Sequence, residues 1–417
     1  MSLVRTKQRS LLASLVATVM LAGAGCAHAP GVAVPPHSSA LAARSQDGTF
    51  LVRLKAGQSP QAWARRHGVR HLAALGLNMH RMGGGELASL ARDAQVAWLE
   101  PESSLRLPPS SGRHVTSPQA PLTSRADGPD DPLLPAQYAW RLLGADRTWR
   151  AQPGRPEVLV AVIDSGIDVS HPDLMGQAFE GWDLTGKVAG PGGLVDGYGH
   201  GTHVAGVIGA RVNNGVGIAG LAPGCKLLPV RIFNNFGHST SGASAAAIVW
   251  AVDHGAKVIN ASWGSPMQSQ AMTDALAYAA DKDVIVVAAA GNSGNNEPKY
   301  PGAEPLAVGV AASNDIDGWA SFSTFGDWVD LAAPGEGVLS TYPLALGNGY
   351  RIMRGTSMAA PHVTAAAALL RSQHPSWSRE QVIERLYVTA KDIVQTGMDP
   401  YAGRGRVDLL GALGLSR

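Results

Sequence analysis

From about Asp131 onward, hydrophobic stretches of strand length alternate with stretches of helical character. The strand-like stretches cover residues 158–163, 227–232, 257–262 and 284–290. The helical stretches lie between them, at residues 200–211, 244–254 and 270–281. Strands that are largely hydrophobic, rather than hydrophobic at every second position, are typical of a parallel sheet covered by helices on both faces. The pattern therefore predicts an α/β fold, a doubly wound and mainly parallel sheet over residues 131–417.

Residues 48–107 show a different pattern. Hydrophobic and polar residues alternate over residues 49–54, which predicts a strand, and residues 60–67 have helical character. Residues 95–99 predict a closing strand. We expect a small α+β domain here, joined to the sheet domain by a linker over residues 108–130 that is rich in Pro, Ser and Gly.

The N-terminus is interpreted as an export signal over residues 1–29. Three basic residues, Arg5, Lys7 and Arg9, precede an apolar run at residues 11–24. This run is shorter than the roughly 20 apolar residues of a membrane-spanning helix. Ala27-His28-Ala29 fits a signal-cleavage site. Alternatively, residues 23–26 resemble a bacterial lipobox, in which Cys26 would carry the lipid. We expect the protein to associate with a membrane only through this lipid or through the signal peptide.

Composition narrows the class of protein. Charged residues make up 16% of the 417 residues, against about 25% in typical soluble domains. The net charge of +2 argues against a nucleic-acid partner, because such proteins usually carry a basic patch. With only two cysteines, a scaffold held by disulfides is excluded, and Cys225 is interpreted as a small buried hydrophobic residue.

Four polar residues stand where the predicted strands end or the predicted helices begin. Asp164 and Asn292 follow buried strands, His200 opens a helix, and Ser357 has the position of a helix N-cap. Taken singly, each has an ordinary interpretation as a turn, surface or capping residue. Ligands of parallel sheets, however, bind outside the carboxyl ends of the strands, so we expect chemistry at this edge.

Three segments that contain these residues resemble the signature blocks of subtilisin-family serine peptidases. They are Val162-Ile-Asp-Ser-Gly166, His200-Gly-Thr-His-Val-Ala-Gly206 and Gly355-Thr-Ser-Met-Ala-Ala-Pro-His362. The chain order Asp, His, Ser separates this family from α/β-hydrolases and from chymotrypsin. The resemblance covers residues 131–417, and residues 48–107 are similar to the inhibitory propeptide of the same family.

The resemblance implies a role for each of the four residues. Ser357 would be the nucleophile, His200 its general base and acid, and Asp164 the group that orients the imidazole. Asn292 and the backbone N–H of Ser357 would stabilise the oxyanion. His200 and His203 lie three residues apart on one predicted helix, but without an H-E-x-x-H motif a zinc site is disfavoured.

By the same resemblance, two segments form the sides of the primary specificity pocket. Their residues are Ser262, Trp263, Gly264, Ala289, Ala290 and Gly291. For Trp263, packing in the core is an equally weighted alternative. Residues 237–241 would supply an edge strand that pairs with an extended peptide, and Lys299, near the pocket floor, predicts tolerance of acidic P1 side chains.

A calcium site is implied by the loop at residues 212–218. Backbone carbonyls of Val212, Val216 and Ile218, the Asn214 side chain, and the carboxylates of Asp131 and Asp173 match the oxygen ligands of a structural Ca²⁺ ion in the family. A plain Asn-Gly turn is the alternative interpretation.

Together these observations predict an exported serine endopeptidase, secreted or held as a lipid-anchored precursor. It would hydrolyse peptide bonds of protein or peptide substrates through an acyl-enzyme, act as a monomer, and be made as a zymogen inhibited by its own propeptide. Self-cleavage is expected between Leu107 and Asp130, and activity should rise with pH as His200 loses its proton. The alternative is a catalytically silent, subtilisin-like binding module.

Overall fold

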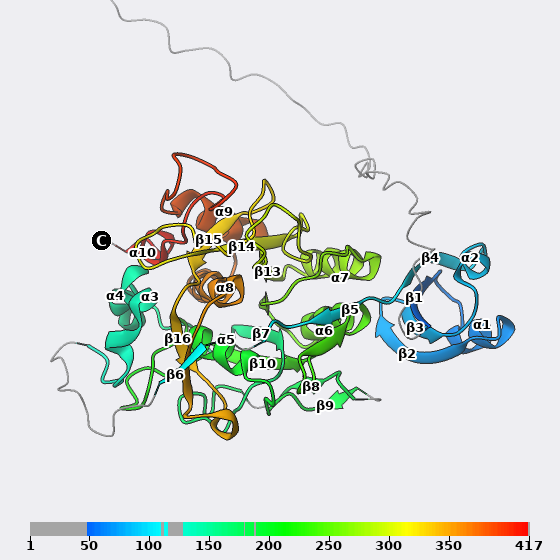
Figure 1. Cartoon of the computed structure of the whole chain (residues 1–417), viewed down its shortest axis with the longest axis horizontal. Coiled ribbons are helices and arrows are strands. Elements are labelled where there is room, and N and C mark those ends of the chain that lie inside the picture. The colour runs from blue at the N-terminus through cyan, green and yellow to red at the C-terminus, as the bar shows by residue number, and fades with distance from the viewer. Residues whose placement is uncertain (1–47, 110–111, 116–127, 179, 187–188, 416–417) are drawn as a thin grey trace, which may run out of the picture. The chain divides into compact units, whose positions relative to one another are not determined.

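The computed structural model describes residues 48–109, 112–115, 128–178, 180–186 and 189–415 (Figure 1). The predicted export signal, Cys26 and most of the predicted linker lie outside these residues. Within the described part of the chain, no helix has the length and apolar character needed to cross a membrane.

An eight-stranded sheet forms the centre of the larger part. In spatial order its strands are β15 (Leu331–Pro334), β14 (Ala307–Ser313), β13 (Ile285–Ala289), β12 (Val258–Ala261), β7 (Leu159–Asp164), β10 (Lys226–Arg231), β8 (Trp182–Asp183) and β9 (Gly190–Pro191). All neighbours are parallel except β8 and β9. The strand order reverses at β7, and Asp164 is its last residue, so Asp164 lies at the switch point where doubly wound sheets bind ligands.

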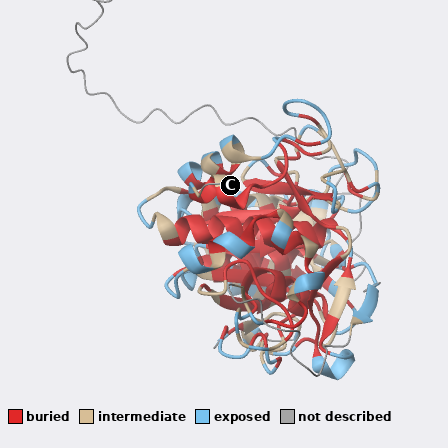
Figure 2. Ribbon diagram, turned by 90° about the vertical axis from the view of Figure 1, so that its left-hand side faces the viewer, coloured by how far each residue is buried: buried red, intermediate tan, exposed pale blue. Residues whose placement is uncertain are grey.

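Helices cover both faces of this sheet, which confirms the predicted fold. Val160 and Val162 of β7 share one hydrophobic cluster with α5 (His200–Gly209) and α8 (Thr356–Gln373). Ala161 and Ile163 share the other with α6 (Ser241–Asp253) and α7 (Gln270–Asp281). Successive side chains of the strand enter opposite cores, and this is why the strand is hydrophobic throughout. Figure 2 shows the resulting buried interior.

Several shorter elements complete this part of the chain. They are α3 (Tyr138–Leu142), α4 (Ala145–Ala151), α9 (Arg379–Thr389), α10 (Leu409–Leu413) and the 3-10 turns at Leu134–Ala136 and Leu344–Leu346. Helix α6 begins three residues before the predicted position, because the Thr240 hydroxyl accepts a hydrogen bond from the N–H of Ala243 and caps the helix there.

The predicted small α+β domain has a four-stranded antiparallel sheet with strand order β2-β3-β1-β4. Its elements are β1 (Thr49–Leu54), α1 (Pro60–Arg66), β2 (Arg70–Gly76), β3 (Met79–Gly83), α2 (Leu87–Leu90) and β4 (Val96–Pro101). The hairpin β2–β3 escaped prediction. Its two-residue loop, Leu77-Asn78, has the left-handed backbone that tight hairpins need, but neither residue is the glycine that usually signals it.

This small domain contacts helices α6 and α7. Leu51 and Met79 belong to the same hydrophobic cluster as the apolar side chains of those helices. The carboxylate of Glu100 accepts hydrogen bonds from the Ser269 hydroxyl and from the N–H of Gln270, both at 2.7 Å. A carboxylate from the small domain therefore caps the N-terminus of α7.

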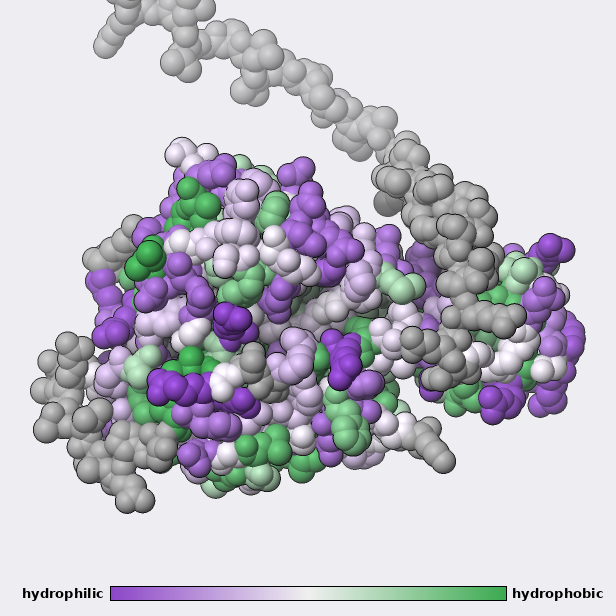
Figure 3. Space-filling model, viewed as in Figure 1, coloured by the Kyte–Doolittle hydropathy of each residue, from purple (hydrophilic) through white to green (hydrophobic). Residues whose placement is uncertain are grey.

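Two further strands lie beside and within the predicted linker. β5 (Ser104–Arg106) pairs with β11 (His238–Thr240), and β6 (Gly112–Val115) joins β16 (Val338–Thr341) and β17 (Tyr350–Met353) in a three-stranded sheet. On the face of the molecule shown in Figure 3, hydrophobic residues form small patches scattered among hydrophilic ones.

Candidate active site

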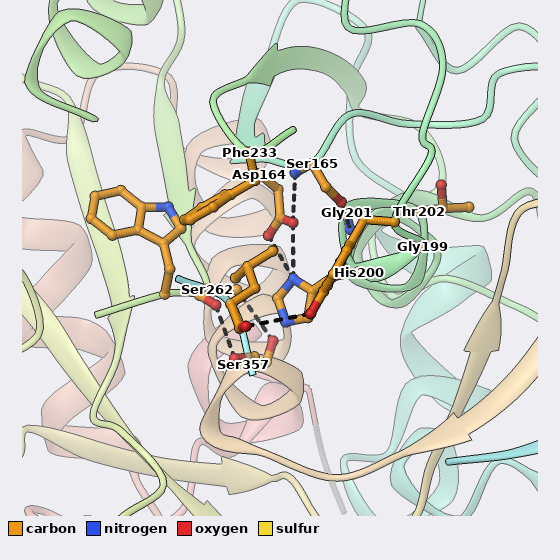
Figure 4. Close-up of polar contacts among 12 residues, drawn as sticks. Asp164, Ser165, Gly199, His200, Gly201, Thr202, Phe233, Ser262 and Ser357 are labelled. Atoms are coloured by element: carbon orange, nitrogen blue, oxygen red, sulfur yellow. Dashed lines mark hydrogen bonds and ion pairs between the residues drawn. The ribbon is translucent and has the colours of Figure 1, made fainter. Parts of the chain in front are cut away.

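Asp164 and His200 are brought together by the contact between the end of β7 and the start of α5 (Figure 4). Nδ1 of His200 lies 2.9 Å from both carboxylate oxygens of Asp164. Because the ionised carboxylate can only accept, Nδ1 carries the proton in the neutral imidazole, and in that form Nε2 keeps its lone pair. Both side chains are buried, and Nε2 has no hydrogen-bond partner among the described residues.

A close approach of backbones holds these two elements in place. The N–H of Gly201 donates to the Ser165 hydroxyl at 2.9 Å. A Cβ on Gly201 would lie only 2.1 Å from the carbonyl oxygen of Gly166, so a glycine is required at this position. Gly201 and Ser165 thus allow the start of α5 to lie close to the end of β7, and this places His200 next to Asp164.

Asp196 organises the loop that leads into α5, and the sequence reasoning missed it. Its Oδ1 accepts the N–H groups of Tyr198 and Gly199 at 2.9 and 2.8 Å. Its Oδ2 accepts the N–H and the hydroxyl of Thr202 at 2.9 and 2.7 Å. Asp196 lies three residues before the N-cap, Gly199, and not at the N-cap itself, where an aspartate signals a helix start, so no local pattern indicated it.

The charge environment of His200 favours its protonated form. Burial lowers the pKa of His200, but the charge of Asp164, its hydrogen bond and the charge of Asp196 together raise this pKa above the ordinary value. The neighbouring His203 is turned away, with Nε2 donating to the carbonyl oxygens of Val338 and Arg351 at 3.1 and 3.0 Å. The part of the chain that the structure describes contains no cluster of three His, Cys, Asp or Glu side chains suited to a metal ion.

Ser357 stands in the first turn of α8 and faces the same cleft. Its hydroxyl donates to the carbonyl oxygen of Ser262 at 2.9 Å, not to His200, so the expected Ser–His hydrogen bond is not formed in this structure. In return, the Ser262 hydroxyl donates to the carbonyl of Ser357 at 2.8 Å. Ser357 and His200 line one cavity of about 150 Å³, and such contacts commonly form only when substrate is bound.

Asn292 is oriented by Thr356, another residue that the sequence reasoning missed. Its Oδ1 accepts the N–H and the hydroxyl of Thr356 at 2.8 and 3.1 Å. This leaves Nδ2 as a hydrogen-bond donor at a cleft that Asn292 lines together with Ser357. A hydroxyl, a base with a free lone pair and a fixed donor are the groups that acyl transfer requires.

A cavity of about 470 Å³ lies beside Ser357. Four of the six predicted pocket residues line it, namely Trp263, Gly264, Ala289 and Gly291. Ser262 and Ala290 are fully buried behind the wall. Trp263 fits both interpretations, since its indole N–H donates to the carbonyl of Ile163 at 2.9 Å while the residue also lines the cavity.

Lys299 also lines this cavity. Its ammonium group lies 2.7 Å from Oε2 of Glu297, and the Lys299 side chain is 14% exposed whereas that of Glu297 is 57% exposed. The ion pair with the largely exposed Glu297 therefore holds the Lys299 side chain at the pocket.

Hydrogen bonds link five of the six predicted calcium ligands at the loop of residues 212–218, namely Asp131, Asp173, Asn214, Val216 and Ile218. Asp131 accepts the N–H of Asn213 at 2.8 Å, and Asp173 accepts the side-chain amide of Asn214 at 3.1 Å and the N–H of Ile218 at 2.9 Å. Neither carboxylate forms an ion pair with a basic side chain within the described ranges.

Burial raises the pKa of both carboxyl groups, Asp131 and Asp173, to about 6. A Cβ on Gly217 would lie 2.4 Å from Oδ2 of Asp173, so the glycine keeps this cradle open. Two buried carboxylates that pair with no basic side chain of the described residues, next to an amide and backbone carbonyls, fit the oxygen donor set of Ca²⁺.

The chain's own residues 104–109 occupy the cleft. Leu107 donates its N–H to the carbonyl of Gly237 at 2.9 Å, which continues the pairing of β5 with β11. The Tyr198 hydroxyl donates to the carbonyl of Pro108 at 2.6 Å. Pro108 and Pro109 line both cavities next to Ser357. Tyr198 is a further contact residue that no sequence pattern indicated.

The chain is similar in sequence to known serine peptidases. The model of the subtilase family matches residues 155–405. Thermitase from Thermoactinomyces vulgaris is 42% identical over 282 residues, which cover 67% of this chain and 97% of thermitase. A thermophilic serine proteinase of Bacillus sp. (strain AK1) is 39% identical over 277 residues, 66% of this chain and 67% of that protein.

A solved structure is similar over most of the described chain. The crystal structure of fervidolysin from Fervidobacterium pennivorans, described as a keratinolytic enzyme related to subtilisin, superposes with a TM-score of 0.77 at 29% identity. The match covers 89% of this chain but only 61% of the fervidolysin chain.

Proposed function

The chain belongs to the subtilase family of serine endopeptidases, and from this premise we propose that Asp164, His200 and Ser357 form its catalytic triad. The observation that carries the proposal is the pair of 2.9 Å contacts between His200 Nδ1 and Asp164, made at the switch point of the sheet and beside Ser357. In this assignment Nε2 of His200 takes the proton of the Ser357 hydroxyl as Oγ attacks the carbonyl carbon of the substrate. The same proton then passes to the leaving amine, and water releases the acyl group.

The oxyanion is stabilised by Nδ2 of Asn292 and by the backbone N–H of Ser357. Thr356 donates two hydrogen bonds to Oδ1 of Asn292, and this orientation leaves Nδ2 free to donate to the oxyanion. Loss of one such donor costs about 10²- to 10³-fold in rate. Asp164 remains ionised throughout and stabilises the imidazolium that forms on His200.

The proposal includes a zymogen stage. Residues 48–107 act as the inhibitory propeptide, and residues 104–109 lie along β11 and beside Ser357 in the manner of a peptide substrate. Cleavage between Leu107 and Asp130 would separate this domain from the catalytic domain, residues 131–417. Export through the signal at residues 1–29, with signal cleavage or lipidation of Cys26, would precede this step.

Calcium is proposed as a structural ion. The carboxylates of Asp131 and Asp173, the side-chain oxygen of Asn214 and the backbone carbonyls of the 212–218 loop would hold it. When bound, the ion supplies positive charge to two buried carboxylates and so stabilises the folded loop.

The pocket lined by Gly264 and Gly291 receives the P1 side chain of a protein or peptide substrate. Ser262, Trp263, Ala289 and Ala290 form its walls and their buried support. The ammonium group of Lys299 would pair with an acidic P1 side chain, which must compete with Glu297 for it.

The test uses the full chain, produced with export, and its Ser357→Ala variant. We expect the wild type to appear as a processed form that reacts with a serine-directed fluorophosphonate, and the variant to stay full length and unlabelled. Ser321→Ala, which changes an exposed serine, is the matched control and should process normally. A wild type that neither processes nor reacts would instead favour the silent binding module, and normal processing of Ser357→Ala would implicate another protease.

A further inference from the structure

The outer edge of β17 carries a second strand-pairing site next to the nucleophile. β6 runs antiparallel to β17, with Gly112 opposite Met353 and Val115 opposite Tyr350. Met353 is the last residue of β17 and precedes Ser357 by only four positions. A peptide on this edge therefore leads directly to the catalytic centre.

The opposite side of the cleft has the corresponding arrangement. β5 runs antiparallel to β11, with Leu105 opposite Ser239, and Leu107 extends the pairing to Gly237. Residues 104–107 and 112–115 of one continuous segment thus pair with two separate edge strands that flank Ser357. Main-chain pairing on both sides of the nucleophile is a property that a long extended polypeptide can use and a short peptide cannot.

Specific side chains support the β17 edge. A Cβ on Gly112 would lie 2.3 Å from the carbonyl oxygen of Ile352, so the paired backbone approaches very closely at this position. Nη2 of Arg351 donates to the carbonyl of Gly112 at 3.3 Å. The guanidinium of Arg351 is itself held, because Nη1 donates to the Tyr342 hydroxyl at 2.8 Å and the group lies over the Tyr342 ring.

We propose that in the processed enzyme the β17 edge binds the primed side of an extended polypeptide substrate, a few residues beyond the scissile bond. The substrate adds a strand to the β16–β17 sheet in the place that β6 holds in the full chain. Because this contact is made mainly by the backbone, it selects extended, unfolded protein chains by length and conformation. It also favours a glycine at the substrate position that faces Met353. The proposal rests on the proposed endopeptidase function.

The experiment compares quenched fluorescent peptides with the same non-primed half and the same scissile bond, cleaved by the processed enzyme. The short peptide ends two residues after the bond and the long peptide continues for six more residues that include a glycine at the position facing Met353. We expect kcat/KM to be at least about tenfold higher for the long peptide, which corresponds to roughly 1.4 kcal/mol. Replacing its glycine by valine should abolish most of this gain, because of the contact with Ile352.

Two further measurements test the geometry. Methylation of single backbone nitrogens in the extension should remove the gain at alternate positions and spare it at those between, since only every second N–H of an antiparallel strand faces its partner. Arg351→Gln should reduce the gain to below about threefold. Arg147→Gln, the same change at an exposed arginine of α4, should preserve it.

Equal kcat/KM for the two peptides overturns the proposal, and so does an effect of methylation that is the same at every position. N-terminal sequencing first establishes that the processed enzyme used in these assays begins after Val115, so that its own strand no longer lies on β17. If neither peptide is cleaved, the proposed function itself fails, whereas equal cleavage of both removes only the inference about β17.

Discussion

Asp196→Asn is the substitution that most directly tests how the fold positions His200. The carboxylate of Asp196 is buried and accepts four hydrogen bonds, two on each oxygen, from the residues that begin α5. An asparagine keeps one acceptor oxygen, but its NH2 group cannot accept from a backbone N–H, and only the Thr202 hydroxyl could turn to accept from it. The substitution therefore leaves at least one buried backbone N–H without a partner and replaces the charged acceptor of the other hydrogen bonds by a neutral group.

The expected loss of stability follows from the lost hydrogen bond and the lost charge. A hydrogen bond to a charged group contributes about 1.5–3 kcal/mol and a neutral one about 0.5–1.5 kcal/mol, so one lost bond and three weakened ones should lower the free energy of unfolding by at least about 3 kcal/mol. For a domain of this size, 1 kcal/mol corresponds to roughly 2–4 °C in Tm, which gives a decrease of about 6–12 °C. Tm should be measured on the fluorophosphonate-inhibited enzyme, so that self-digestion does not contribute.

Activity should change in a way that a general loss of stability does not explain. The charge of Asp196 contributes to the raised pKa of His200, and in the proposed mechanism only neutral His200 can accept the serine proton. Removing this charge lowers the pKa, so the acid limb of the kcat/KM profile should move to lower pH while the plateau falls. Asp146→Asn, at an exposed site on α4, should leave both quantities unchanged. If Asp196→Asn melts within 2 °C of the wild type and its acid limb does not move, the role assigned to Asp196 is wrong.

Three other predictions concern the proposed calcium site, the proposed specificity pocket and the small domain of residues 48–107. Chelation should lower the Tm by several degrees and added Ca²⁺ should restore it, since ligand at 100 times its Kd contributes about 2.7 kcal/mol; an unchanged Tm would argue for a plain turn. Lys299→Ala should reduce cleavage after glutamate about tenfold relative to cleavage after leucine in a peptide library, and an unaltered ratio would exclude a role for the lysine in P1 selection. Burial, with a contribution from the charge of His71, lowers the pKa of His80 to about 4. The unfolded form of the small domain therefore binds more protons between pH 6.5 and 4, and the free energy of unfolding should decrease as the pH is lowered, by about 1.4 kcal/mol per pH unit. Hydrogen exchange of residues 48–107 in the Ser357→Ala protein should reveal this, and His80→Leu should flatten the dependence; identical protection at pH 7 and 4.5 would contradict it.

Patterns local in the sequence predicted the fold well. The apolar run at residues 158–163 corresponds to β7, and its alternate side chains enter two different cores. Burial on both faces leaves a signal in every residue of such a strand. By contrast, β2 exposes most of its side chains and left no comparable pattern, so the hairpin with β3 was missed. Helix α6 begins before its predicted start because the Thr240 hydroxyl caps it, and hydrophobic periodicity does not indicate such a cap.

The candidate site also has features that local sequence predicted and features that only the folded chain shows. Residue types and their spacing sufficed to single out Asp164, His200, Asn292 and Ser357, because each stands at the end of a strand or the start of a helix. Only the folded chain brings Asn292 to Thr356, which is 64 positions away, and the Tyr198 hydroxyl to Pro108, which is 90 positions away. The hydrogen bond of Ser357 to Ser262, in place of His200, was equally a matter of tertiary packing.

The sequence by itself determined the class of fold, the chemistry and the order of the reactive groups, because hydrophobic periodicity and short motifs are properties of neighbouring residues. The tertiary structure decided which groups hold the reactive ones in place and which edges of the sheets receive a peptide. β6 shows the difference, since nothing in residues 112–115 indicates a strand until β17, more than 200 positions later, offers its free edge. Contacts between such distant segments depend on the packing of the whole chain, and a local pattern contains no record of them.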